Sequence, residues 1–213
     1  RAGTGPVLFD GDGVVRPIRV RDAGVLEREL AANRGWLRPW EATVPGGGGP
    51  YDVRSGIRSL LRHSRTGASL PFVIEVDGEF AGQINVSSIS SGSLSSATIG
   101  YWVSERFAGR GVTPTAVALV TDHLLLGMGI HRVEICIRPE NRPSLRIVEK
   151  LGYRYEGLRR RYIHIDGGWR DHFSFALTAE DVSLGLLRRW RNGQVDQSLA
   201  TIPDADRAAA GLV

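Results

Sequence analysis

Residues 99–114 read IGYWVSERFAGRGVTP and decide the fold. In the first half every second residue is a large apolar one, which predicts a strand. The second half predicts the start of a helix, because Thr113 is a suitable N-cap and Pro114 fits the first helical turn. Gly109 and Gly111 lie between the two elements, where N–H groups at the helix start attract anions and glycines admit a phosphate. The stretch therefore predicts a pyrophosphate-binding loop.

A glycine pair of this kind also occurs in plain strand-to-helix turns, so a second signal is needed. The loop lacks the Gly-Lys-Ser/Thr ending of nucleotide P-loops and the third glycine of dinucleotide-binding folds. A second stretch reads NRPS at residues 141–144 and KLGY at residues 150–153. A predicted helix and a strand of alternating apolar residues separate it from the first stretch.

Together the two stretches resemble the GNAT superfamily of acetyl-coenzyme A-dependent N-acetyltransferases. The family's loop has the pattern Q/R-x-x-G-x-G/A, and its later motif is N-x-x-S/A followed by K-x-G-F/Y. The later motif matches in full, whereas Ala108 and Thr113 replace the first and last residues of the loop pattern. The resemblance covers roughly residues 14–178. It implies an α/β fold with a mixed, mostly antiparallel sheet, flanking helices and a central splayed strand pair that holds the thioester.

The resemblance implies acetyl-CoA as co-substrate. The strand backbone at Trp102 and Val103 could pair with the pantetheine arm and offer an N–H to the oxyanion. In the family, Asn141 corresponds to a residue that contacts the pantetheine chain, and Ser144 to one near the sulfur. The predicted cofactor-binding residues are Trp102, Val103, Gly109, Arg110, Gly111, Val112, Thr113, Asn141 and Ser144.

Acyl transfer to an amine needs a proton donor for the thiolate and a base for the amine. Ser144 is the candidate donor, since Val148 occupies the position where many GNAT enzymes carry a tyrosine; its alternative role is to cap the following helix. Glu134, on the polar face of its strand, is the candidate base acting through water, with an ion pair to a neighbouring arginine as the alternative. Asp171 and His172 are further candidates for the base.

Residues 34–41 read RGWLRPWE and resemble the W-L-x-P-W stretch of the ribosomal-protein N-terminal acetyltransferases, the Rim-type branch. We therefore expect direct attack on the thioester by a primary amine, first of all a protein N-terminal α-amine, with a ribosomal protein as a candidate partner. The amine is expected to enter between residues 36–40 and the last predicted hairpin. The predicted substrate-binding residues are Trp36, Trp40, Tyr101, Tyr162 and His172.

Two other functions stay open on the sequence. One is acetylation of a small amine, such as an aminoglycoside, a polyamine or an amino-acid derivative. The other is a non-catalytic module that binds acyl-CoA, which the departures from the family pattern at Ala108, Thr113, Thr98 and Val148 would allow. The two tryptophans of residues 36–40 could likewise cover the core instead of lining a substrate site.

The chain has 213 residues and a net charge of +4, too small to indicate nucleic-acid binding. Its single cysteine, Cys136, excludes an intrachain disulfide and favours a reducing compartment. No apolar run approaches the roughly 18 residues of a membrane span, so we expect a cytoplasmic protein. The histidines show no H-E-x-x-H or clustered spacing, which predicts no metal site. A monomer and a homodimer are both compatible with the sequence.

The pattern predicts a flexible lead at residues 1–13, one acetyltransferase domain at residues 14–190 and a C-terminal tail at residues 191–213. Strands are expected at residues 14–20, 71–76, 80–87, 99–104, 132–138, 153–164 and 169–178. Helices are expected at residues 22–33, 51–65, 114–128, 142–151 and 180–190.

Overall fold

A parallel pair of strands lies at the centre of the fold. In the computed structural model, which describes residues 5–212, β5 (Ser96–Val103) pairs with β6 (Arg132–Ile137) only from Ser96 to Thr98. Beyond that point β5 stays paired with β4 and β6 with β8, so the two strands diverge. The predicted splayed pair is confirmed.

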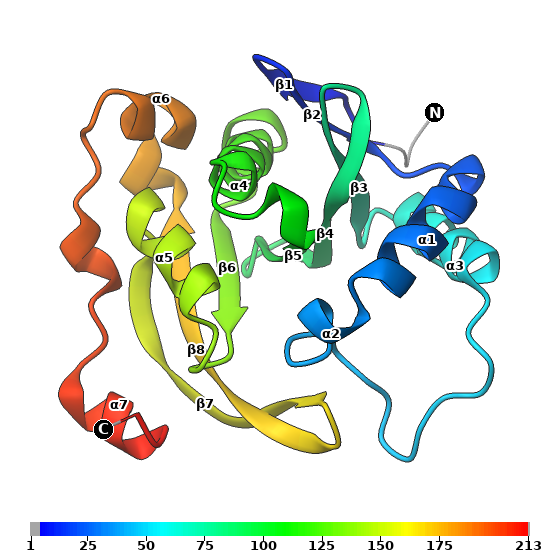
Figure 1. The fold of residues 1–213 in the computed structure, drawn as a ribbon. Coiled ribbons are helices and arrows are strands. Elements are labelled where there is room, and N and C mark those ends of the chain that lie inside the picture. Colours follow the sequence, from blue (N-terminus) through cyan, green and yellow to red (C-terminus); the bar gives the residue numbers. More distant parts are fainter. Residues whose placement is uncertain (1–4, 213) are drawn as a thin grey trace.

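The sheet has eight strands in the order β1-β2-β3-β4-β5-β6-β8-β7, and its other neighbouring pairs are antiparallel (Figure 1). This mixed, mostly antiparallel sheet is the predicted fold class. The remaining strands are β1 (Leu8–Asp10), β2 (Gly13–Pro17), β3 (Leu70–Val76), β4 (Glu79–Ser90), β7 (Arg154–Ile165) and β8 (Gly168–Thr178).

Helices cover both faces of the sheet. On one face α4 and α5 bury Val117 and Val148, and on the other α1 and α3 bury Leu26 and Ile57 against Val73. Full burial of such a side chain contributes about 1.5–3 kcal/mol relative to exposure. The helices are α1 (Ala23–Ala32), α2 (Arg34–Leu37), α3 (Val53–Arg65), α4 (Val112–Asp122), α5 (Arg142–Leu151), α6 (Leu186–Arg191) and α7 (Asp204–Ala209).

Strand β6 shows how the alternation in the sequence separates the two faces. Val133, Ile135 and Ile137 are at most 3% exposed and belong to the core under α4 and α5. Glu134 and Cys136 therefore point to the opposite face, because successive side chains of a strand alternate. The cleft described below uses both faces.

The predicted flexible lead contains a strand. Leu8–Asp10 form β1 and pair with β2, so the boundary at residue 13 is wrong for this part of the lead. Residues 1–4 of the predicted lead lie outside the described residues. The strand is only three residues long, and so short a segment carries little periodic signal.

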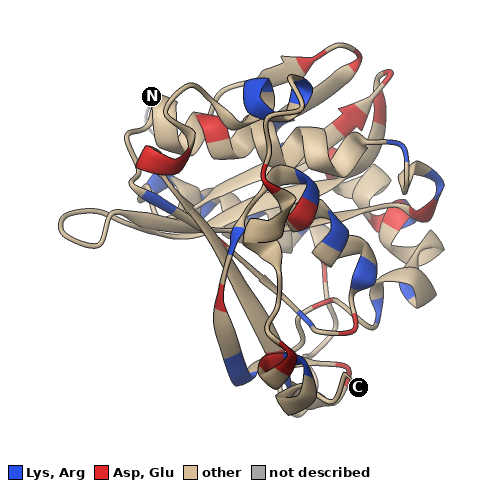
Figure 2. Cartoon of the chain, turned by 90° about the vertical axis from the view of Figure 1, so that its left-hand side faces the viewer, with Lys and Arg blue, Asp and Glu red and all other residues tan. Residues whose placement is uncertain are grey.

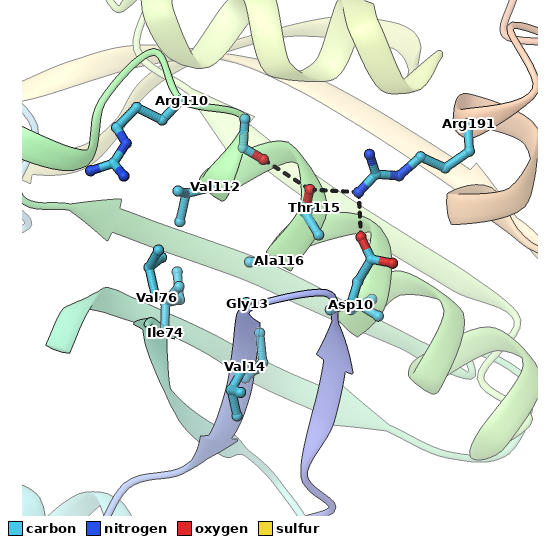
Figure 3. Close-up of a pocket in the computed structure, with 13 residues that line it drawn as sticks. Asp10, Gly13, Val14, Ile74, Val76, Arg110, Val112, Thr115, Ala116 and Arg191 are labelled. Atoms are coloured by element: carbon cyan, nitrogen blue, oxygen red, sulfur yellow. Dashed lines mark hydrogen bonds and ion pairs between the residues drawn. The ribbon is translucent and has the colours of Figure 1, made fainter. Parts of the chain in front are cut away.

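The predicted tail packs on the domain. It includes a 3-10 turn at Gln197–Ala200 and the helix α7, with Ala200 and Ile202 buried. Figure 3 shows Arg191, where the tail begins, paired with Asp10 of β1 beside a cavity of about 170 Å³ between the β1–β2 hairpin and α4. Residue Asp10 of the predicted lead and the first residue of the predicted tail thus lie in contact beside α4, which the sequence pattern did not indicate.

Two helix boundaries differ from the prediction. Helix α4 begins at Val112 with Gly111 as its N-cap, so Thr113 lies inside the first turn and is not the cap. The helix predicted at residues 180–190 is divided into a 3-10 turn, Ala179–Val182, and α6. Gly185 between them has φ 99°, which a continuous right-handed helix cannot contain.

Candidate active site

A cleft of about 410 Å³ opens in the splay between β5 and β6. Its walls come from these strands, from β4, β7 and β8, from the start of α5 and from the segment after α2. It brings together six predicted site residues: Trp40, Tyr101, Trp102, Asn141, Ser144 and His172. Its lining does not include Trp36, Val103, Glu134, Tyr162 or the loop at residues 109–113.

The loop between β5 and α4 has the geometry of an anion-binding site. Gly109 and Gly111 have φ of 73° and 75°, in the left-handed region that glycine adopts without strain. A Cβ at either position would meet nothing within 4 Å, so the space beside them is open. Val112 and Thr113 supply terminal N–H groups of α4, while Pro114 has none. This loop fits a phosphate group of coenzyme A.

A hydrogen-bond network fixes the start of this loop. Asn33, at the end of α1, donates to Ser104 Oγ at 3.2 Å and accepts the Glu105 N–H at 2.9 Å. Ser104 Oγ donates to Glu29 Oε2 at 2.6 Å, and Glu29 pairs with Arg106. Burial raises the pKa of Glu29, but the hydrogen bonds from Ser104 and Arg106 outweigh it and hold the pKa below its usual range. Local sequence patterns do not predict this network, because it joins segments that are distant in the chain.

Two hydroxyl groups meet across the splay. The oxygen atoms of Tyr101 on β5 and Ser144 on α5 are 2.7 Å apart. The N-cap of α5 is Asn141, whose Oδ1 accepts the N–H of Ser144 at 3.2 Å. The interpretation of Ser144 as the helix cap is therefore wrong, and its hydroxyl is available to the cleft.

The phenol of Tyr101 stays protonated at neutral pH. Burial raises its pKa to about 12, against a smaller lowering by the hydrogen bond with Ser144. A neutral phenol can donate to Ser144 Oγ and so orient the Ser144 proton toward the cleft. Val148 is fully buried in the core. The position where many family members carry a tyrosine therefore offers no hydroxyl group to the cleft. Tyr101 brings a phenol to Ser144 from β5, a pairing that no local sequence pattern predicts.

The backbone of β5 is only partly available to a ligand. The Ser104 N–H donates to the Ala81 C=O at 2.8 Å, and hydrogen-bonded pairs recur every second residue along an antiparallel ladder. Trp102 is in the next such pair, so its backbone N–H and C=O face β4, and its pairing with the pantetheine arm stays a prediction that this register does not favour. The Val103 backbone faces the open edge, where its C=O accepts the Trp36 indole N–H at 2.9 Å. Trp36 is thus hydrogen-bonded to β5, and its role in substrate binding stays a prediction.

His172 presents a neutral imidazole to the cleft. The side chain is 3% exposed, and its Nδ1 lies 3.0 Å from the Arg170 C=O, which assigns the proton to Nδ1. Burial lowers the pKa of His172, and the contact with Arg170 only partly offsets this. Nε2 is left as an acceptor with no hydrogen bond to any other residue within 5–212. Tyr162 is 41% exposed outside the cleft, and its ring packs edge-on against His172 at 5.9 Å.

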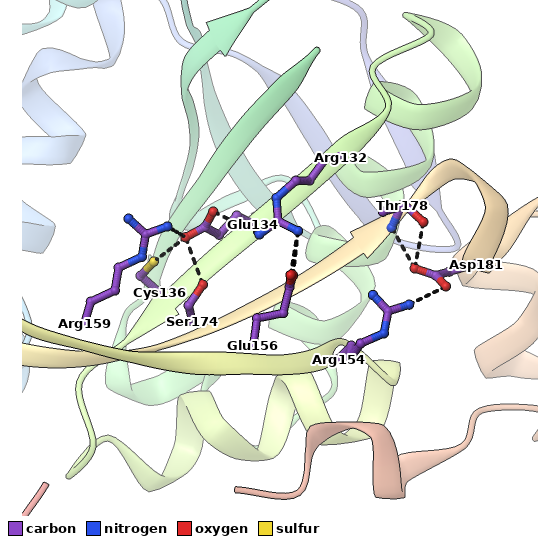
Figure 4. A network of polar contacts seen from close by, with 9 residues as sticks. All are labelled: Arg132, Glu134, Cys136, Arg154, Glu156, Arg159, Ser174, Thr178 and Asp181. Carbon is purple, nitrogen blue, oxygen red and sulfur yellow. Dashed lines mark hydrogen bonds and ion pairs between the residues drawn. The ribbon is translucent and has the colours of Figure 1, made fainter. Parts of the chain in front are cut away.

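Glu134 lies at the centre of an ion-pair network (Figure 4). Its Oε1 accepts from Arg159 at 2.6 Å, Ser174 at 2.9 Å and Cys136 at 3.1 Å, and its Oε2 from Arg132 at 3.3 Å. Burial raises the pKa of Glu134, but these hydrogen bonds and the two arginines outweigh it and hold the pKa below its usual range. The ion pair expected as the alternative for Glu134 is present, and Glu134 is not among the residues that line the cleft, so its role as the base stays a prediction.

The two segments expected to flank the amine entrance are joined to each other. Ala42 forms a β-bridge with Ile165, and the Thr43 N–H donates to the His164 C=O at 2.8 Å. Trp40, just before this bridge, lines the cleft. These contacts join the hairpin to residues 42 and 43, and the entry of the amine between residues 36–40 and the hairpin stays a prediction. We call residues 40–43 the strap.

Known proteins share this architecture and its motifs. The sequence profile described as Acetyltransferase (GNAT) domain matches residues 14–154. The chain belongs to the GNAT acetyltransferase family. This GNAT chain is 29% identical over 178 residues to the Escherichia coli ribosomal protein uS5-alanine N-acetyltransferase, covering 81% of the chain and 90% of that protein. It is 25% identical over 158 residues to the E. coli spermidine N(1)-acetyltransferase, covering 74% and 81%. Mycobacterium smegmatis RimJ, solved with CoA-disulfide, superposes with a TM-score of 0.80 at 38% identity, covering 89% and 93%.

As a GNAT protein with relatives of the Rim type, the chain is an acetyl-CoA-dependent N-acetyltransferase. Among residues 5–212 no three potential metal-ligating side chains gather, and no helix there has the length and apolar character to cross a membrane. In the view of Figure 2, basic and acidic residues are interspersed over the helices and strands. This side therefore offers no extended basic face to a nucleic acid.

Proposed function

We propose that this GNAT enzyme acetylates the N-terminal α-amine of a protein, with ribosomal proteins as the acceptor class. The observation that carries the proposal is the length of the match to the uS5-alanine N-acetyltransferase, 81% of the chain and 90% of that protein. A match of this length extends well beyond the two coenzyme A motifs, and so includes elements that would face the acceptor.

The composition of the cleft favours a peptide over a polyamine. Trp40, Ile163 and Ile165 form apolar walls of the cleft where we propose that the acceptor binds. Glu41 is the single carboxylate among the described residues that line the cleft. A polyamine carries several positive charges, each of which costs free energy to bury without a carboxylate partner. A peptide N-terminus needs one amine site and tolerates apolar walls.

Acetyl-CoA supplies an acetyl group activated as a thioester. After the transfer, coenzyme A leaves as the free thiol. Three groups of the chain are proposed to assist. The N–H of Val103, which faces the open edge of β5, is proposed to stabilise the oxyanion. The Ser144 hydroxyl, oriented by Tyr101, gives a proton to the departing sulfur. His172 Nε2 takes the proton of the amine nitrogen as that nitrogen bonds to the acetyl carbon.

Replacing Ser144 by alanine is expected to lower kcat about tenfold and to leave the KM for acetyl-CoA within about twofold, because the hydroxyl acts on the leaving group and not on the ground state. Tyr101→Phe should lower kcat less, since Ser144 keeps its own proton. Steady-state kinetics with release of free thiol as the readout measure both. A Ser144→Ala variant that loses only acetyl-CoA affinity would show that Ser144 binds the cofactor and donates no proton.

The proposed acceptor class is tested with a substrate panel. The purified enzyme is offered peptides with the N-terminal sequences of ribosomal proteins, spermidine and an aminoglycoside at one acetyl-CoA concentration. We expect the highest kcat/KM with a peptide. A higher kcat/KM with spermidine or the aminoglycoside would replace the proposed function by small-amine acetylation.

Trp40→Ala is expected to raise the KM for the peptide about tenfold while the KM for acetyl-CoA stays within about twofold, because Trp40 is the residue of the strap whose large ring lines the cleft. The matched control is Trp169→Ala, which removes a tryptophan that is 56% exposed and outside the cleft. If the melting temperature of Trp40→Ala falls and both KM values rise together, Trp40 is a core residue instead.

A further inference from the structure

Asn85 on β4 is a polar side chain of the cleft without a partner in the protein. It lines the cleft, and its Oδ1 is buried with no hydrogen bond to residues 5–212. Gln83, two residues earlier on the same face, has its Oε1 occupied by the indole N–H of Trp102 at 3.0 Å. Buried polar groups in folded proteins are nearly always hydrogen-bonded, so a free carboxamide in a cleft indicates a ligand.

Asn85 lies on the face of the sheet that α1 and α3 cover, where we propose that the acceptor binds. Its neighbour Ile84 belongs to the core under α4, so the Asn85 side chain points to the opposite face. Directly across on β5 is Gly100, where a Cβ would meet nothing within 4 Å, so space is open beside the carboxamide. His172 lies on the same face, because its neighbour Phe173 points into that core. The carboxamide and the imidazole thus border one space.

The chemistry of a carboxamide matches that of a peptide group. An asparagine side chain offers one acceptor oxygen and two N–H donors, so it can pair with the N–H and C=O of a peptide bond. A polyamine has N–H donors but no carbonyl, and can use only half of this site. We infer that Asn85 binds the first peptide group of the acceptor and thereby selects peptide N-termini over amines without an amide. This inference rests on the proposed function and identifies Asn85 as the residue that recognises the peptide group of the acceptor.

The test compares two acceptors that differ in one group. One is a peptide that the full-length enzyme acetylates, and the other carries an ester oxygen in place of the first peptide N–H. We expect the wild-type kcat/KM to fall about tenfold with the ester, since a buried acceptor loses its donor. In Asn85→Leu the peptide and the ester should be acetylated at nearly the same, lower rate. The KM for acetyl-CoA should not change.

Stability separates this role from a structural one. Because Asn85→Leu removes an unpaired buried polar group, its melting temperature is expected to equal or exceed that of the wild type. The control Asn192→Ala, at an exposed position after α6, should keep the full discrimination between the two acceptors. If Asn85→Leu discriminates as well as the wild type, the inference is wrong and the proposed function stands. If the wild type acetylates no peptide but does acetylate spermidine, the proposed function is wrong and the inference with it.

Discussion

Replacing Gly111 by valine is expected to weaken acetyl-CoA binding at least about a hundredfold. Gly111 has φ 75°, where a β-branched residue is strained by roughly 1–3 kcal/mol. The loop would relieve that strain by moving, and the N–H groups at the start of α4 would then no longer converge on a phosphate. The added side chain would also enter the open space beside the loop, where the phosphate is expected.

Isothermal titration with coenzyme A measures the loss directly. The control is Gly49→Val, because Gly49 has no left-handed φ and a Cβ there also meets nothing within 4 Å. We expect Gly49→Val to bind coenzyme A as the wild type does. An unchanged affinity of Gly111→Val, in a protein that melts normally, would show that the phosphate lies elsewhere.

Local patterns in the sequence were sufficient for the central part of the fold. Alternation in β6 and the helix-start chemistry of α5 predicted both elements nearly to the residue, because each signal lies within its own segment. The lead and the tail were not predicted correctly, because their order comes from contacts such as Asp10 with Arg191, 181 residues apart. A pattern of neighbouring residues cannot predict a contact between residues so far apart in the sequence.

The site divides in the same way. The glycine loop could be predicted because its geometry is local. The Tyr101–Ser144 hydrogen bond joins residues 43 positions apart, and the contact of Trp36 with Val103 joins residues 67 apart. The free carboxamide of Asn85 is visible only when every neighbour is placed. The ion pairs of Glu134 are a further example, since its polar strand face predicted either a base or an ion pair and only the folded structure brings Arg132 and Arg159 to its carboxylate.

Replacing His172 by glutamine is expected to lower kcat about a hundredfold, the lower end of what general-base catalysis contributes. Its Nδ1 proton is bonded to the Arg170 C=O, so Nε2 is the atom free to accept a proton. Because burial lowers the pKa of His172 below 6.5, the imidazole is neutral and active at pH 7, and activity is lost as the pH falls through that lowered value. The pH–rate profile of the glutamine variant should lack this fall in activity at low pH (the acid limb). The dependence on the substrate's own α-amine, which loses its proton near pH 8, should remain.

The pH profile of kcat and of kcat/KM, measured between pH 5 and pH 9, distinguishes a base from a packing residue. A matched control is His63→Gln on α3, because His63 makes the same kind of Nδ1 contact, to the Ser59 C=O at 2.9 Å, but lies exposed and outside the cleft. We expect that variant to keep both the wild-type kcat and its acid limb. If His172→Gln loses activity by the same factor at every pH and the acid limb persists, His172 only shapes the cleft, and the proton must leave the amine through water.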